Sequence, residues 1–169
     1  MWTQQRNKLV GSGAVGKAAQ GHSVSLSADG NPAIVGGFLD GAGPGAAWVW
    51  TRSGGFWSQQ SKLIGSGVIG VANQGFAVSI SGDGNRAIVG GLADNHQGAA
   101  WAWTRSGGLW SRSDKLVGSG AEGNALQGTA VGLSADGNTA IVGGSDDATK
   151  TGAAWVFAPV VQRRRAVER

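Results

Sequence analysis

Few residues in this sequence could carry out acid, base or nucleophilic chemistry. The chain has no cysteine, and its only histidines are His22 and His96. A serine nucleophile could lie in a Gly-x-Ser-x-Gly elbow, but the sequence contains none. His22 precedes Ser23 in an alternating segment, so the two side chains point to opposite faces of a strand and form no dyad. The sequence therefore predicts that the protein is not an enzyme.

Polar residues suited to ligand binding gather in three loops at corresponding places in the chain, Leu39–Pro44, Ala93–Gln97 and Ser145–Lys150. Variable loops on a rigid repeated scaffold are where binding residues usually lie. The alternative is that these loops are only solvated. The candidate ligand-binding residues, each with a carboxylate, amide or imidazole group, are Asp40, Asp94, Asn95, His96, Asp146 and Asp147.

The eight tryptophans offer a second kind of binding chemistry, because an exposed indole can stack on a sugar ring. Trp48 and Trp50 share one face of a predicted strand, as do Trp101 and Trp103. Small residues of the neighbouring repeat can pack against these pairs, so we expect them in the core. The candidates for glycan stacking are the three tryptophans of the outermost predicted strand, which we expect to be exposed: Trp2, Trp57 and Trp110.

The pattern Gly-x-Gly-x-x-Gly occurs three times, at Gly11–Gly16, Gly65–Gly70 and Gly118–Gly123. A dinucleotide site would place a helix directly after this pattern and an acidic residue about 20 positions later. Each copy is followed instead by a short polar segment and a predicted strand. We interpret the pattern as a loop that connects repeats and not as a nucleotide site.

All of these residues belong to a repeat that organises the whole chain. Ser25–Gly37 returns as Ser79–Gly91 and again as Gly132–Gly144, about 53 residues apart. Within each repeat the apolar residues alternate with a period of two, which favours strands over helices. The 32 glycines are consistent with many tight turns between those strands.

Four strands fit each repeat, and in the first copy they are Gly21–Ser27, Ala33–Gly37, Ala46–Arg52 and Trp57–Ile64. The turn at Asp29–Asn31 joins the first two. Ala33–Gly37 is uniformly apolar, so we expect it to be buried on both faces. Four short antiparallel strands repeated at this spacing are typical of propeller blades. The predicted fold is an all-β propeller built from three four-stranded antiparallel blades of about 53 residues.

The two ends of the chain indicate how the blades are completed. Trp2–Val10 matches the fourth strand of the repeat, whereas the third copy has only three strands, so we expect the N-terminal strand to complete the last blade. Closed propellers typically have 4 to 8 blades, and three leave too wide an angle to close. We therefore expect a homodimer in which two chains meet head to tail in a six-bladed ring, with each Trp2–Val10 strand completing the last blade of the partner. The alternative is that the chain is a fragment of a longer propeller with a purely structural role.

Charge and hydropathy exclude two classes of partner. The expected division of the chain is residues 1–158 for the blades and residues 159–169 for a basic tail, which carries most of the formal net charge of +4. The blades are nearly neutral, so we expect no nucleic-acid partner. No stretch of about 18 uninterrupted apolar residues occurs, so we expect no membrane insertion. The N-terminus also lacks the apolar core of a signal peptide.

The repeat resembles the FG-GAP repeat, which forms the blades of the integrin-α propeller. The Phe-Gly-x-Ser-Val and Val-Gly-Ala-Pro elements of that family match two segments in each copy, with glutamine in place of the phenylalanine. The resemblance implies a noncatalytic module that binds a protein partner, with a glycan ligand as the alternative, and an extracellular or cell-surface location. The matching segments are Gln20–Val24, Gln74–Val78 and Gln127–Val131 for the first element, and Val35–Phe38, Val89–Leu92 and Val142–Ser145 for the second.

Many FG-GAP repeats hold calcium in their first hairpin, and this chain departs from that pattern. Calcium needs six to eight oxygen ligands, several of them carboxylates. Each hairpin here keeps a single carboxylate, from Asp29, Asp83 or Asp136. We therefore expect no metal and no other cofactor, and we expect these aspartates to hydrogen-bond the backbone of their own turns.

Overall fold

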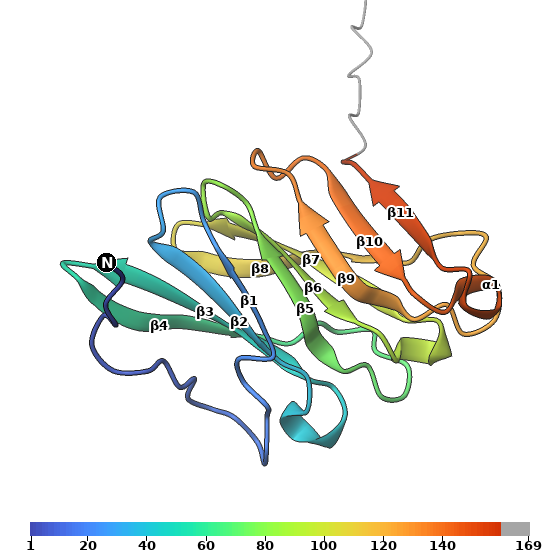
Figure 1. The fold of residues 1–169 in the computed structure, drawn as a ribbon, viewed down its shortest axis with the longest axis horizontal. Coiled ribbons are helices and arrows are strands. Elements are labelled where there is room, and N and C mark those ends of the chain that lie inside the picture. Colours follow the sequence, from blue (N-terminus) through green and yellow to red (C-terminus); the bar gives the residue numbers. More distant parts are fainter. Residues whose placement is uncertain (160–169) are drawn as a thin grey trace, which may run out of the picture.

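The computed structural model describes residues 1–159 as three antiparallel sheets that lie side by side (Figure 1). We name them blade 1, blade 2 and blade 3 in chain order. Blade 1 contains β1 (Ser23–Leu26), β2 (Pro32–Gly37), β3 (Ala46–Ser53) and β4 (Phe56–Leu63). Blade 2 contains β5 (Gln74–Ile80), β6 (Arg86–Gly91), β7 (Ala99–Ser106) and β8 (Leu109–Leu116). Blade 3 contains β9 (Gln127–Leu133), β10 (Ala140–Gly144) and β11 (Ala153–Phe157).

The strands predicted from Gly21 onward are confirmed to within two residues at each end. Neighbours in sequence are neighbours in each sheet, because short turns join them as hairpins. The Asp-Gly-Asn and Ser-Gly-Gly turns lie at one end of the blades. At the other end, which we call the loop end, short helical turns follow the second strand of each blade: η1 (Asp40–Ala42), η2 (Asp94–His96) and α1 (Asp147–Lys150).

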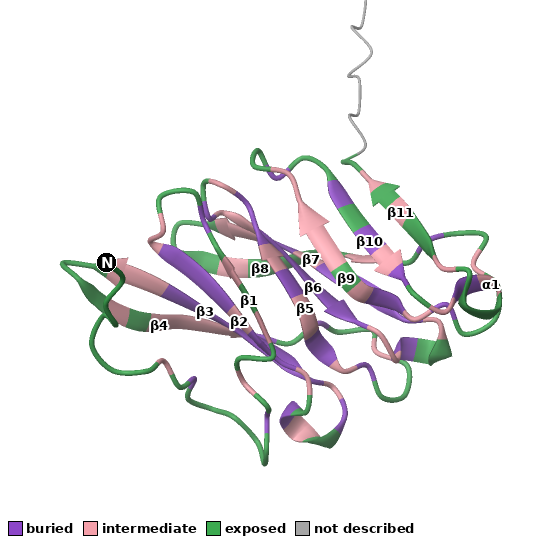
Figure 2. Cartoon of the chain, viewed as in Figure 1, coloured by how far each residue is buried: buried purple, intermediate pink, exposed green. Residues whose placement is uncertain are grey.

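The core runs through the middle strands of the blades and between them. In Figure 2 the buried residues concentrate in β2, β3, β6 and β7. Trp48 and Trp101 are fully buried, and Trp50 and Trp103 are nearly so. The expected core position of these two pairs is therefore confirmed. Blade faces pack on one another, with β5 against β1 and β2, and with β9 against β5 and β6.

The repeated glycine pattern is explained by the buried tryptophan of the third strand. In blade 2 the indole Nε1 of Trp101 donates a hydrogen bond of 2.9 Å to the Ser66 carbonyl. A Cβ at Gly65 would overlap the indole ring of Trp101. Blade 1 repeats this contact between Gly11 and Trp48. The first glycine of each Gly-x-Gly-x-x-Gly loop is thus required by tryptophan packing, and no helix follows the loop.

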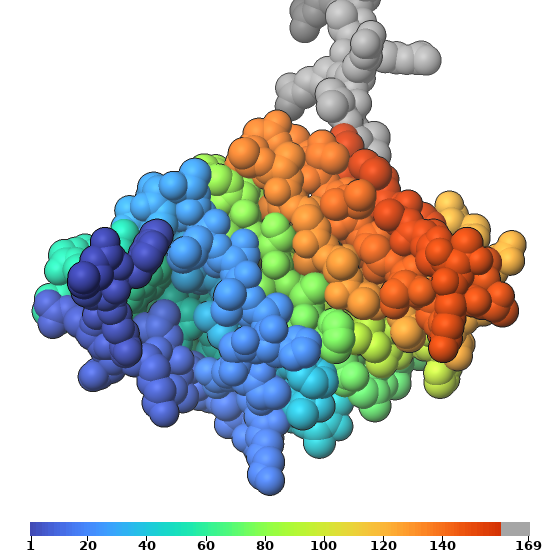
Figure 3. Space-filling model, viewed as in Figure 1, coloured from blue at the N-terminus to red at the C-terminus, as the bar shows by residue number. Residues whose placement is uncertain are grey.

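The structure corrects the predicted N-terminal strand. Residues 2–10 form no strand and pair with no sheet, and blade 3 has three strands within residues 1–159. Figure 3 shows the N-terminal segment and the C-terminal part of blade 3 at opposite ends of the molecule. A strand needs a partner for its N–H and C=O groups. In a single chain, Trp2–Val10 has no free sheet edge of blade 3 within reach, and the three blades do not close.

Most of the predicted basic tail, residues 160–169, lies outside the described residues. Within residues 1–159, no helix is long and apolar enough to cross a membrane.

Gly65→Ala is expected to lower the free energy of unfolding by ~1 to 3 kcal/mol, because the added methyl group overpacks the site of the Trp101 indole. Urea unfolding followed by tryptophan fluorescence measures the change. Gly143→Ala is the control, since a Cβ there meets its nearest neighbour at an ordinary 3.4 Å. Equal stability of the two variants would contradict the packing argument.

Candidate functional site

Three of the predicted ligand-binding residues are buried beneath the loop end. Asp40 accepts a hydrogen bond of 2.7 Å from the Val15 N–H, and Asp94 accepts one of 2.8 Å from the Ile69 N–H. Asp147 makes the same contact in blade 3, where its Oδ1 accepts 2.8 Å from the N–H of Glu122. Each carboxylate therefore ties the Gly-x-Gly-x-x-Gly loop of its blade to the helical turn after the second strand.

In blades 1 and 2 a lysine of the fourth strand occupies the other carboxylate oxygen. Lys62 pairs with Asp40 at 2.5 Å, and Lys115 pairs with Asp94 at 2.5 Å. The same ammonium groups donate to the carbonyls of the glycine loops at 2.7 and 2.6 Å. These aspartates are fully engaged, so they stabilise the loop end and present no free carboxylate to a ligand.

A glutamine completes this loop anchor in every blade. In blade 2 the side chain of Gln74 accepts a hydrogen bond of 2.6 Å from the Gly65 N–H and donates one of 2.9 Å to the Gly65 carbonyl. Gln127 makes the corresponding pair of bonds, and both glutamines are completely buried. This pairing gives a physical reason for glutamine at the position where the FG-GAP pattern has phenylalanine.

The other predicted binding residues lie in two separate loops. Asn95 and His96 are exposed on η2, both with positive φ, and Asp146 is half-buried at the start of α1. Within residues 1–159 their side chains make no hydrogen bond or ion pair, and no group of three or more His, Asp or Glu side chains could hold a metal ion. The structure does not gather the six predicted residues into one site.

The tryptophans of the fourth strand differ in exposure. Trp2 is fully exposed, whereas Trp57 and Trp110 are half-buried against core clusters, which corrects the expectation that all three are exposed. Arg52 lies 5.4 Å from the ring centre of Trp57, and Arg105 lies 5.9 Å from that of Trp110. A cation over an indole face is favourable. It also covers a face on which a sugar would stack.

An aromatic cluster at the loop end was not foreseen from the sequence. The rings of His22 and Phe38 lie 4.5 Å apart, and His22 lies 4.6 Å from Phe76 of blade 2. The two phenylalanines meet edge to face at 5.4 Å. The sequence signal is faint, because blade 3 has Thr129 and Ser145 at the matching positions.

Exposed apolar residues also lie in the loops at the loop end. The N–H groups of Val15 and Ile69 bind the buried aspartates, which places both residues at this end. Val71 would contact a side chain at Gly43, in the loop after β2. We call the whole set the loop-end patch, and its members are Val15, His22, Phe38, Leu39, Ile69, Val71 and Phe76.

The hairpin aspartates at the opposite end hold their turns, as predicted. Asp29 Oδ1 accepts hydrogen bonds from the Ser27 hydroxyl at 2.6 Å and from the Asn31 N–H at 3.0 Å. These bonds, the Ser27 bond foremost, lower the pKa of Asp29 from 3.8 to about 2. Asp136 has the same partners in blade 3 and a pKa of about 2, and the pKa of Asp83 is also lowered.

No protein-family model and no curated protein sequence matches the chain. Among solved structures it is similar to Sqt1 of Saccharomyces cerevisiae, with 11% identity over 86% of this chain and a TM-score of 0.52. It is similar to the periplasmic gluconolactonase PpgL of Pseudomonas aeruginosa, with 15% identity over 80% and a TM-score of 0.54. It is also similar to the hydrazine synthase of Kuenenia stuttgartiensis, with 13% identity over 82% of this chain and a TM-score of 0.50.

The chain has a propeller-like fold. The matched region is 33% to 38% of the length of these three proteins. Identities this low show the fold alone, since one fold supports many unrelated functions. The sheets of the described chain form an open set of blades and not a closed ring.

Replacing the hairpin aspartates is expected to flatten the acid side of the stability profile. Between pH 2 and 3.8 the unfolded chain binds more protons at Asp29 than the folded chain does. The stability from this carboxylate is therefore present above pH 3.8 and is lost as the pH falls toward 2. Urea unfolding from pH 2 to 5 should show a shallower slope for Asp29→Asn. Asp114→Asn, which removes an exposed carboxylate outside the turns, is the control and should leave the slope unchanged.

Asp94→Ala is expected to lower the free energy of unfolding by ~1 to 3 kcal/mol, because it leaves the Ile69 N–H and the Lys115 ammonium without their acceptor. Denaturant titration measures this. Asp146→Ala, in the matching loop of blade 3, should stay within ~0.5 kcal/mol of the wild type. If the Asp94→Ala variant is as stable as Asp146→Ala, Asp94 has no structural role at the loop end.

Proposed function

We propose that this chain is a noncatalytic propeller module of the FG-GAP type that binds a protein partner through the loop-end patch. The observation that carries the proposal is the aromatic cluster of His22, Phe38 and Phe76, which lies at the surface of two adjacent blades. Aromatic residues are enriched in protein interfaces and supply many of their energetic hot spots.

The surroundings of this cluster favour a protein over a small ligand. Leu39 and Ile69 are about half exposed, and both come from loops that the buried aspartates hold in place. Monomeric proteins seldom expose apolar residues in groups without a binding role. The fixed loops present these side chains at little entropic cost, which favours binding by a preformed surface.

The noncatalytic part of the proposal rests on the absence of a reactive constellation. His22 packs at a tilt against two phenylalanines, and the described residues contain no group of three or more acidic or histidine side chains that could hold a metal ion. The gluconolactonase likeness extends to the fold and carries no catalytic residue to this chain. Catalysis by a pair of acid and base groups would need such groups within hydrogen-bond reach of each other or of a substrate.

A glycan-binding role for Trp57 and Trp110 receives less support. Both indoles are half-buried, and an arginine lies over each ring. The Nε1 of Trp110 is also engaged, since it donates 2.8 Å to Gln60. Sugar stacking at these positions would have to displace structural contacts.

The test replaces two exposed members of the patch by aspartate, Leu39→Asp with Ile69→Asp. Partners captured by the wild-type chain from cells of its source are identified by mass spectrometry, and the purified partner is then titrated by calorimetry. The double variant should bind at least tenfold more weakly, which is ~1.4 kcal/mol of binding free energy.

Leu109→Asp is the matched control, because Leu109 is equally apolar and more exposed but lies at the start of β8, at the opposite end of blade 2. It should bind like the wild type. Unchanged affinity in the double variant would refute the patch as the binding surface. Glycan-array binding that disappears in Trp57→Ala and Trp110→Ala would contradict the proposal and support a glycan-binding role for these two tryptophans.

A further inference from the structure

The described chain ends in two open blade faces that complement each other. Between blades 1 and 2, Ile34 and Val49 of blade 1 share a buried cluster with Val78 and Ile80 of blade 2. The repeat places Ile141 and Val156 of blade 3 at the positions of Ile34 and Val49, and these two side chains are 46% and 66% exposed. Among residues 1–159, blade 3 thus shows the same apolar face with nothing packed on it.

Blade 1 exposes the other half of this contact. Val24 and Leu26 occupy the positions of Val78 and Ile80, and they are 68% and 61% exposed. The two open faces therefore have the residues that pack together inside the chain. Surfaces that differ from each other and occur on one molecule make a head-to-tail contact, which forms a ring if the rotation closes.

Blade 3 also lacks the partner of its buried aspartate. Asp147 keeps its hydrogen bond to Glu122, but within residues 1–159 no lysine pairs with its second oxygen. In blades 1 and 2 that lysine comes from the fourth strand. Within the same range, the outer edge of β11 pairs with no strand, so its N–H and C=O groups are available to one.

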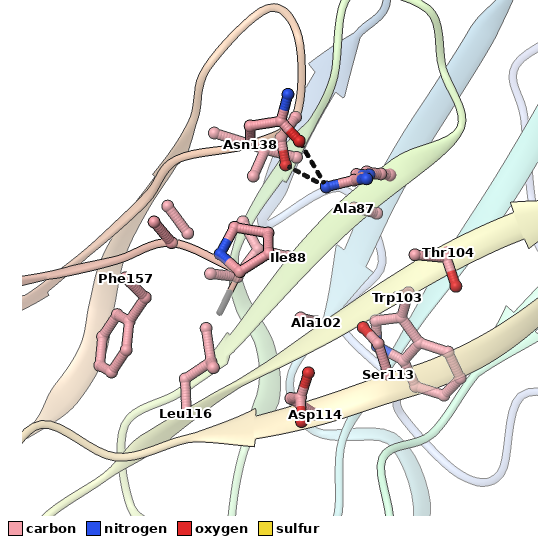
Figure 4. Close-up of a pocket in the computed structure, with 16 residues that line it drawn as sticks. Ala87, Ile88, Ala102, Trp103, Thr104, Ser113, Asp114, Leu116, Asn138 and Phe157 are labelled. Carbon is pink, nitrogen blue, oxygen red and sulfur yellow. Dashed lines mark hydrogen bonds between the residues drawn. The ribbon is translucent and has the colours of Figure 1, made fainter. Parts of the chain in front are cut away.

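A cleft of about 270 Å³ between blades 2 and 3 marks the place of a missing tryptophan (Figure 4). At the matching place between blades 1 and 2, Trp110 packs on the core cluster and its Nε1 bonds to Gln60. Ser113, the counterpart of Gln60, lines the cleft together with Leu116 and Phe157. The cleft is apolar and lies where the fourth strand of blade 3 would begin.

The N-terminal segment carries the residues that these vacant positions need. Lys8–Gly11 repeats the Lys-Leu-(Ile/Val)-Gly sequence that ends the fourth strand of blades 1 and 2, and the fully exposed Trp2 precedes it. The spacing from Trp2 to Lys8 is one residue longer than from Trp57 to Lys62. Both complete blades have a register shift at this point of the strand, and a bulge is where an extra residue is accommodated.

The segment already lies where a neighbouring blade would use it. Gln5 accepts a hydrogen bond of 2.9 Å from Arg52 of blade 1. In the same way, Gln60 of blade 1 accepts a hydrogen bond of 3.3 Å from Arg105 of blade 2. A groove of about 640 Å³ is bounded on one side by residues 5–10 and on the other by Trp50, Phe56 and Trp57. The N-terminal segment thus takes the place of the fourth strand of a blade that is not part of this chain.

We propose that this absent blade is blade 3 of a second copy of the chain. The open face of blade 3 of one copy packs on the open face of blade 1 of the other. The N-terminal segment of each copy pairs with β11 of its partner as the fourth strand. Lys8 of this segment binds Asp147 of the second copy, and Trp2 fills the cleft between blades 2 and 3 of the second copy. Two such junctions give six blades, within the usual range of closed propellers.

The mass in solution is the first test. Light scattering and sedimentation of the full chain at about 10 µM should give twice the chain mass of 17.0 kDa. A single-chain mass at this concentration overturns the proposal. So does an open series of larger masses, because a ring of two copies has no free faces.

Lys8→Glu tests the ion pair without disturbing the fold, since Lys8 is exposed in the single chain. It should raise the dissociation constant of the dimer by ~10-fold or more, because a like charge would face the buried Asp147. Lys17→Glu, an exposed lysine outside the segment, should leave the constant unchanged. Equal effects of the two variants would contradict the assigned contact.

A disulfide trap tests the register. Leu63 faces Ala47 and Leu116 faces Ala100 in the complete blades, so Leu9 should face Ala154 of the second copy. The chain has no cysteine of its own, so Leu9→Cys with Ala154→Cys should give a covalent dimer under mild oxidation. Leu9→Cys with Val156→Cys, two residues along β11, is the control and should not cross-link. A disulfide within one chain, or equal cross-linking of both pairs, refutes the proposed pairing.

Discussion

The complete burial of a third-strand tryptophan, Trp48 in blade 1 and Trp101 in blade 2, is the constraint on which the rest of this structure depends. Trp48 and Trp101 can lie flat against the incoming loop only because glycine occupies the facing position, and their indole nitrogens are satisfied by the carbonyl that follows. A large aromatic ring contributes much of the apolar area that a thin sheet can bury. The glycine loop, the glutamine that clamps it and the aspartate beneath it all serve to keep that ring covered.

This arrangement divides the polar residues of the chain into two groups. Asp40, Asp94 and Asp147 look like surface residues in the sequence, yet they are buried, because their carboxylates hold loop N–H groups that no backbone partner satisfies. The side chains left at the surface of the loop end include the apolar members of the loop-end patch and polar residues such as Asn95 and His96.

The residues that pack between adjacent blades recur at equivalent positions on the outer faces of blades 1 and 3. Every contact between adjacent blades uses one face of each, so a set of three blades leaves two faces that match. The exposed valine, leucine and isoleucine residues on them are therefore consequences of the repeat and not of local composition. The N-terminal segment lies against blade 1, where residues 5–10 border a groove with Trp50, Phe56 and Trp57.

The sequence by itself determined the repeat, the strand boundaries, the Asp29 turn and the core role of Trp48, because alternation and turn chemistry are local properties. Only the tertiary structure decided that Asp94 is buried, that His22 meets two phenylalanines and that residues 2–10 form no strand. Each of these depends on which segments distant in sequence lie side by side. A buried ion pair joins a loop to a strand about 20 residues later, and an unpaired strand depends on an edge at the far end of the molecule. Such contacts are not encoded in the alternation of a strand or in the chemistry of a turn, so these local patterns could not reveal them.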